Sequence, residues 1–130
     1  MEELYNNEFT DSEIKEMLNQ NSNIINLTNE EVQTNIEILK KIGCEPRHIK
    51  NILISNPYYL NKDKTTIINL INFLRKVGLN PLNLVFDSNP WLLNKEVFEI
   101  KNYIKAKEKE GFPLSDIIDI IDSNPFIIEE

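Results

Sequence analysis

The sequence has one cysteine, one histidine and three glycines among its 130 residues. A single cysteine excludes an intramolecular disulfide framework and a cysteine-based zinc cluster, and a single histidine excludes a metal site built on a histidine pair. No stretch is long and apolar enough to cross a bilayer. The acidic N-terminal residues show neither the apolar core of a secretory signal nor the arginines of a transit peptide. We therefore expect a soluble, cytoplasmic protein with no membrane partner and no bound metal.

The motifs of catalysis are missing as well. The sequence contains no glycine-rich phosphate loop, no nucleophile elbow and no metal-ligand cluster. We expect no enzymatic activity, no cofactor and no small-molecule ligand. With 41% hydrophobic and 27% charged residues, the composition is that of an ordinary globular protein, and the length predicts a single domain over residues 1–130.

The sequence does contain a repeat of about 33 residues. The tripeptide Ser-Asn-Pro begins at positions 55, 88 and 123, with spacings of 33 and 35 residues, and the three glycines recur with spacings of 35 and 33. An aromatic residue follows each repeat proline. Markers that share one period indicate a repeat protein. They are the glycines Gly43, Gly78 and Gly111, the prolines Pro57, Pro90 and Pro125, and the aromatics Tyr58, Trp91 and Phe126.

Each unit is predicted to contain two helices. Apolar residues precede each repeat proline by eight, five and four positions, which is the spacing of one face of a short helix. A second set precedes each glycine by eleven, eight, seven and four positions and predicts a longer helix that ends at the glycine. In the clearest unit these residues are Ile49, Ile52 and Leu53, followed by Ile67, Leu70, Ile71 and Leu74.

The predicted fold is an all-α solenoid, a short superhelical stack of about three and a half helix-pair repeats. Capping boxes at Thr10 with Glu13, and at Thr28 with Glu31, predict two of the helix starts. The units are expected near residues 9–43, 44–78, 79–111 and 112–130.

The first unit departs from the repeat pattern. A Ser-Asn pair at residues 22–23 lies 33 residues before the first Ser-Asn-Pro, and matching the two places Ile24 at the proline position. In this alignment Ile14, Met17 and Leu18 are out of phase by two residues. We interpret this unit as a degenerate end unit of the kind that caps a solenoid.

A short helix, a proline followed by two apolar residues and leucine, and a longer helix ending near Phe-Leu before a glycine resemble the mitochondrial transcription termination factor (mTERF) repeat. The match is clearest over residues 42–78, with Pro-Tyr-Tyr-Leu at 57–60 and Phe-Leu at 73–74, and it extends over about residues 9–128. The resemblance implies a curved α-solenoid whose positively charged concave face binds nucleic acid. The abundance of Asn, Ile and Lys, all with AT-rich codons, indicates a low-GC genome, so we expect a short bacterial or phage member.

The net charge of −7 is unevenly distributed along the chain. Residues 1–31 carry a net charge of −7, residues 32–109 one of +6 and residues 110–130 one of −6. The central repeats are therefore basic between two acidic ends. Because the acidic ends repel a polyanion, a bound strand is expected to be short or confined to the central units.

Lysines recur in the last turn of each predicted longer helix. Lys41, Lys76 and Lys109 occupy equivalent positions, and stacking the repeats would align them along one edge. Such a lysine row would follow a phosphate backbone, although lysines in a last helical turn also complement the helix dipole. Lys62 and Lys95 form a second matched pair, because each occupies the same position of its repeat unit. The candidate contacts to DNA or RNA are Lys40, Lys41, Lys62, Arg75, Lys76, Lys95 and Lys109.

A second function remains open at the acidic ends. Asp116, Asp119 and Asp122 are spaced by three along one predicted helix face. They would suit a basic protein partner, with the chain acting as an adaptor or as an inhibitor that imitates nucleic acid. The simpler interpretation is the solvated face of a capping helix.

Three further features have structural interpretations. The aromatics that follow the repeat prolines offer base-stacking surfaces, but their strict phase favours packing between repeats. His48 falls between Arg47 and Ile49 on the polar side of its helix, which predicts a solvated histidine. Cys44 has no second thiol or histidine to partner it and is expected to be a small buried or semi-buried residue.

Overall fold

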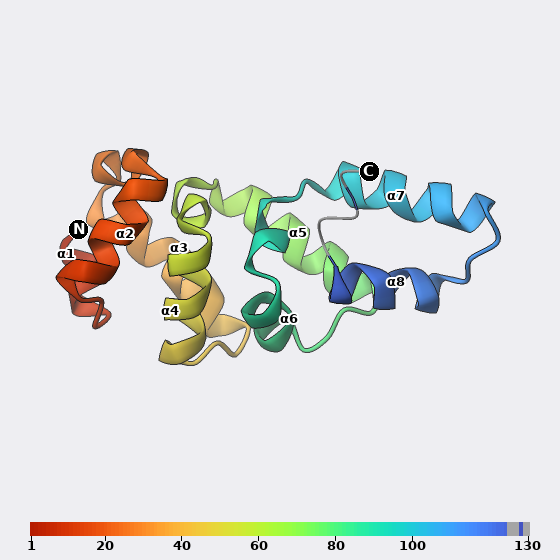
Figure 1. Ribbon diagram of the computed structural model, residues 1–130, viewed down its shortest axis with the longest axis horizontal. Coiled ribbons are helices and arrows are strands. Elements are labelled where there is room, and N and C mark those ends of the chain that lie inside the picture. Colours follow the sequence, from red (N-terminus) through yellow and green to blue (C-terminus); the bar gives the residue numbers. More distant parts are fainter. Residues whose placement is uncertain (125–127, 129–130) are drawn as a thin grey trace.

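The computed structural model describes residues 1–124 and 128, and over these residues it contains helices and no strands. A short α-helix, a 3-10 turn and a longer α-helix follow one another repeatedly (Figure 1). The predicted all-α helical-repeat fold is confirmed. The elements are α1 (Glu2–Asn6), α2 (Asp11–Gln20), η1 (Ser22–Asn26), α3 (Asn29–Lys41), α4 (Pro46–Ser55), η2 (Pro57–Asn61), α5 (Lys64–Val77), α6 (Leu82–Ser88), η3 (Pro90–Asn94), α7 (Val97–Lys109) and α8 (Leu114–Ser123).

The helices form two rows along an elongated stack. The short helices α2, α4 and α6 pack on one another in sequence, and so do the long helices α3, α5 and α7. Helix α1 packs on α3 at the N-terminal end, and α8 packs on α7 at the other end (Figure 1). Each unit therefore contacts mainly its sequence neighbours, as in a solenoid.

The apolar periodicity produces one continuous core. The seven residues that define the clearest unit, Ile49, Ile52, Leu53, Ile67, Leu70, Ile71 and Leu74, are all 0 to 4% exposed. They belong to a single buried cluster that runs from α1 to α8. Burying a side chain of this size stabilises the fold by about 1.5 to 3 kcal/mol, which makes this stripe the main source of stability for the stack.

The helix ends follow the expected local chemistry. Thr10 and Thr28 each accept a hydrogen bond from the backbone of the third residue of the helix, and the glutamate there caps the threonine N–H in return. Pro46 occupies the first turn of α4, where its missing N–H costs nothing. Gly78 ends α5 at a φ of 107°, a left-handed conformation that glycine adopts without strain.

An asparagine ends each of the short helices α2, α4 and α6 and joins its unit to the next. Asn56 Nδ2 donates to the Pro90 carbonyl at 2.9 Å and to Asn94 Oδ1 at 3.0 Å, and Asn94 Nδ2 donates back to Asn56 Oδ1 at 2.9 Å. Asn21 likewise donates to the Pro57 carbonyl and to Asn61 Oδ1. Asn89 donates to the carbonyl of Asp122. We call Asn21, Asn56, Asn61, Asn89 and Asn94 the asparagine ladder.

The predicted alignment of the first unit is wrong by two residues. Asn21 ends α2 as Asn56 ends α4, with similar backbone angles of φ −143° and −138°, so Ser22 and not Ile24 takes the place of Pro57. With this register Ile14 and Met17 are in phase, and both are buried. Aligning Ser22-Asn23 with Ser55-Asn56 matched Asn23 to Asn56. The true equivalent of Asn56 is Asn21, which ends its helix and donates to the next unit in the same way.

The expectation of a solvated His48 is also wrong. The side chain is only 4% exposed, and its Nδ1 accepts a hydrogen bond from the Glu45 backbone N–H at 3.0 Å. The imidazole turns back over the first turn of α4 and takes the capping role that glutamate has in α2 and α3. Cys44 is buried as predicted, and burial together with the charge of Asp87 raises the pKa of its thiol to about 11.

Candidate nucleic-acid interface

The lysine row lies at the ends of the long helices. Lys41 and Lys109 are the last residues of α3 and α7, and Lys76 is in the last turn of α5. All three are exposed. Their neighbours differ, because Lys40 forms an ion pair with Glu37 at 3.5 Å while Arg75 is exposed and has no carboxylate within ion-pair distance among the described residues.

Lys62 and Lys95 are placed less favourably for a ligand. Each follows a 3-10 turn and lies between that turn and the next long helix. Lys62 Nζ is 4.0 Å from Glu96 Oε1 with its side chain 17% exposed, and Lys95 is only 5% exposed. The matched pair therefore does not present two accessible cations, because its sequence position places both residues at a packed junction.

A groove runs between α5 and α7 on the long-helix side of the stack. It has a volume of about 490 Å³, within the range of about 300 to 1,000 Å³ that is usual for ligand pockets. Lys101 bridges its two walls, since Nζ lies 5.6 Å from the ring centroid of Phe73 on α5. We call this the α5–α7 groove. Its lining residues are Thr66, Asn69, Asn72, Phe73 and Lys76 from α5, and Glu96, Val97, Phe98 and Lys101 from the start of α7.

The α5–α7 groove carries more positive charge than the corresponding groove one unit earlier. That earlier groove, beside α3, has Lys41 and Lys64 in its lining, but it also contains Glu3, Glu30 and Glu37. Two lysines face only Glu96 in the α5–α7 groove. Equivalent positions thus have different electrostatic surroundings, and the basic character of the central repeats is concentrated at α5 and α7.

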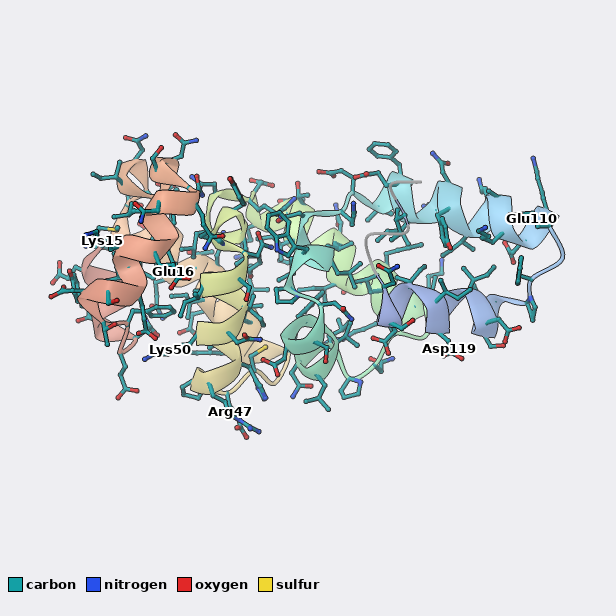
Figure 2. The ribbon with its side chains drawn as sticks, in the orientation of Figure 1. Lys15, Glu16, Arg47, Lys50, Glu110 and Asp119 are labelled. Atoms are coloured by element: carbon teal, nitrogen blue, oxygen red, sulfur yellow. The ribbon has the colours of Figure 1, made fainter. Side chains whose placement is uncertain are left out.

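The short-helix side does not offer a comparable basic surface. Figure 2 shows Lys15 and Glu16 on α2, Arg47 and Lys50 on α4, and Asp119 on α8. Lys50 Nζ is 3.1 Å from Glu13 Oε1, so part of this positive charge is neutralised within the protein. In this row only α4 is basic, and α2, α6 and α8 are net acidic, whereas the long helices α5 and α7 are both net basic.

Sequence reasoning missed several residues of the α5–α7 groove. Phe98 and Lys101 line the groove from one face of α7, and Lys105 lies one turn further on the same face. Asn69 and Asn72 form a similar stripe on α5 with Lys76, which the lysine row already included, and no carboxylate interrupts it. The sequence does show each of these two helical stripes. Only the packing of α5 beside α7 joins them into one site.

The aromatics after the repeat prolines pack between repeats, as the sequence favoured. The rings of Tyr58 and Trp91 lie 5.9 Å apart at an angle of 51°, and the Tyr58 hydroxyl donates to the Gln20 carbonyl at 2.7 Å. Each aromatic therefore contacts a neighbouring unit. The third member, Phe126, lies outside the described residues.

The aspartates of α8 are exposed at the far end of the stack. Asp116, Asp119 and Asp122 form no ion pair with any cation in the part of the chain that the structure describes. Within the same residues there is no cluster of His, Cys, Asp and Glu that could hold a metal ion. Nor does any helix there reach the length and apolar character needed to span a bilayer.

Comparison with known proteins agrees with the repeat architecture. No curated protein matches the chain. A family model described as mTERF matches residues 1–130, and membership in that family implies a helical-repeat module that binds nucleic acid. The short helix, the proline turn and the longer helix recur in this structure in the order that the resemblance implied. The chain belongs to the mTERF family.

Proposed function

We propose that the chain is a non-enzymatic module that binds DNA or RNA through the long-helix side of its central repeats. The observation that carries this proposal is the set of exposed cations around the α5–α7 groove, whose α5 wall contains no acidic residue. The central contacts are Arg75, Lys76, Lys101 and Lys105, with Lys41 and Lys109 of the lysine row on either side.

The physical basis is neutralisation of phosphate. Each lysine or arginine that contacts a phosphate releases a condensed counterion, so affinity falls steeply as salt rises. The acidic ends, with net charges of −7 in residues 1–31 and −6 in residues 110–130, oppose a polyanion beyond the central units. Lys40 contributes less because of its ion pair with Glu37. Lys62 and the buried Lys95 are left out of the proposed contacts.

The test is a titration of labelled DNA and RNA by fluorescence anisotropy at several salt concentrations. The variant Lys76→Glu/Lys101→Glu is expected to lower affinity at least tenfold and to reduce the slope of log K against log salt by about 1.4 to 1.8, because two phosphate contacts are lost. The control Lys15→Glu/Arg47→Glu has the same change of charge on the short-helix side. Equal losses in both variants would show a general charge effect and contradict the proposed surface.

A protein-binding role at α8 is the second candidate. Its supporting observation is that Asp116, Asp119 and Asp122 are exposed on one helix without a cation partner among the described residues. These carboxylates would engage a basic protein and leave the α5–α7 groove free. A basic partner whose binding is lost in Asp116→Asn/Asp119→Asn/Asp122→Asn and retained in Lys76→Glu/Lys101→Glu would support this role, and the reverse pattern would exclude it.

A further inference from the structure

We propose that the α5–α7 groove binds an unpaired nucleobase of a single strand, with Phe98 as its stacking surface. The inference rests on the proposed function and adds the kind of strand that is bound. The first observation is the exposure of Phe98, which the packing of the helices does not require. Phe98 is 63% exposed in the first turn of α7, while Ile100, Tyr103 and Ile104 of the same helix are buried in the core.

The surroundings of Phe98 are polar and basic. Lys76 and Lys101 line the same groove, and Lys105 lies one turn beyond Lys101 on α7. A single exposed apolar side chain needs no functional explanation. An exposed aromatic ring beside cations, at the edge of a groove, is the arrangement that stacks a base while its phosphates are neutralised.

Two amides of the groove are available to a ligand. Asn69 and Asn72 lie one turn apart on α5, and neither side chain forms a hydrogen bond in the part of the chain that the structure describes. By contrast, the amides of the asparagine ladder are used between repeats. A free amide offers both donors and an acceptor, which match the edge of a nucleobase.

Lys101 is held in position for a phosphate next to that base. Its ammonium group lies 5.6 Å from the centroid of Phe73 on the opposite wall of the groove, and no carboxylate of residues 1–124 forms an ion pair with it. The cation–π contact restricts the side chain and leaves its charge uncompensated. Lys76, on α5, supplies a second cation at the same groove.

A single strand fits this site better than a duplex. In a duplex each base is already stacked on its neighbours, so Phe98 would have no free base face to contact. An unpaired base can leave its strand and enter the groove. Both DNA and RNA supply such bases, and stacking of this kind tolerates any base because every base has a π-face.

The experiment measures binding of strands of about eight nucleotides, a length typical of single-strand sites. Labelled oligo-uridine RNA, oligo-thymidine DNA, a duplex of equal length and an abasic strand are titrated with the full chain and its variants. Phe98→Ala is expected to weaken single-strand binding by about 5- to 150-fold, the effect of losing one stacked base, and Phe98→Trp to retain it. The matched control is Ile68→Ala, which truncates an exposed apolar side chain of α5 that lies outside the groove.

The result supports the proposal if the wild-type chain prefers single strands to both the duplex and the abasic strand, and if that preference disappears in Phe98→Ala. A loss confined to RNA or to DNA identifies the strand. The proposal is overturned if Phe98→Ala binds like the wild type, or if an acidic oligoglutamate peptide displaces the strand at equal concentration. Failure of all nucleic acids to bind would instead refute the proposed function.

Discussion

Replacement of Asn56 by alanine tests whether the asparagine ladder holds the repeats together. Asn56 is completely buried, donates two hydrogen bonds to the next unit and accepts one from Asn94. A hydrogen bond contributes about 0.5 to 1.5 kcal/mol net, so three bonds predict a loss of about 3 kcal/mol in the free energy of unfolding. Part of this loss is the desolvation penalty of the Pro90 carbonyl, which loses the Asn56 amide in the variant.

The assay is urea unfolding followed by circular dichroism. Asn69→Ala is the matched control, since the Asn69 side chain is exposed and makes no hydrogen bond within the described residues, and its expected change is about 0.5 kcal/mol or less. The double variant Asn56→Ala/Asn94→Ala should cost about 1 to 2 kcal/mol less than the sum of the single variants, because the two amides pair with each other. Additive losses, or an Asn56→Ala variant as stable as Asn69→Ala, would refute a reciprocal pair that links the repeats.

Three further predictions concern other structural features. Gly78→Ala is expected to lower the free energy of unfolding by about 1 kcal/mol because its φ is 107°, and Gly78→Asn by less, since asparagine tolerates this conformation better; urea unfolding measures both. His48→Ala is expected to cost about 1 to 2 kcal/mol in the same assay, because the part-buried Glu45 N–H loses its acceptor. Burial raises the pKa of Cys44 from 9.0 to about 11, so the unfolded thiol ionises first and stability should fall by up to about 3 kcal/mol as pH rises across that interval. Cys44→Ala removes that contribution, and an unchanged pH slope in this variant would assign the effect to other groups such as Tyr59, whose pKa burial also raises.

The helices were predictable because their signals are local. The apolar spacing that ends at Leu53 and Leu74, and the stop at Gly78, depend only on helix geometry and backbone freedom. The positions of Lys41, Lys76 and Lys109 in the last turns of the long helices were predictable for the same reason. Their differing surroundings were not predictable, because Glu3 lines the same groove as Lys41 from α1, a distant part of the sequence.

The roles of polar residues at apolar positions depended on tertiary contacts. Asn35 occupies a position that is leucine in the next unit, and the sequence alone marks it as a defect of the pattern. In the structure its amide donates to the carbonyls of Tyr59, Leu60 and Lys62 at 3.0 to 3.2 Å, and the Tyr59 hydroxyl donates to the Asn35 carbonyl. An amide in this position caps the neighbouring 3-10 turn, which no periodicity could indicate.

The sequence by itself determined the repeat, the helix pair in each unit and the uneven distribution of charge, because each is a property of spacing along the chain. The tertiary structure alone decided the register of the first unit, the burial of His48 and Lys95, and the meeting of α5 and α7 in one basic groove. Burial and electrostatic surroundings depend on which side chains approach from distant parts of the sequence, and that is settled only when the helices pack.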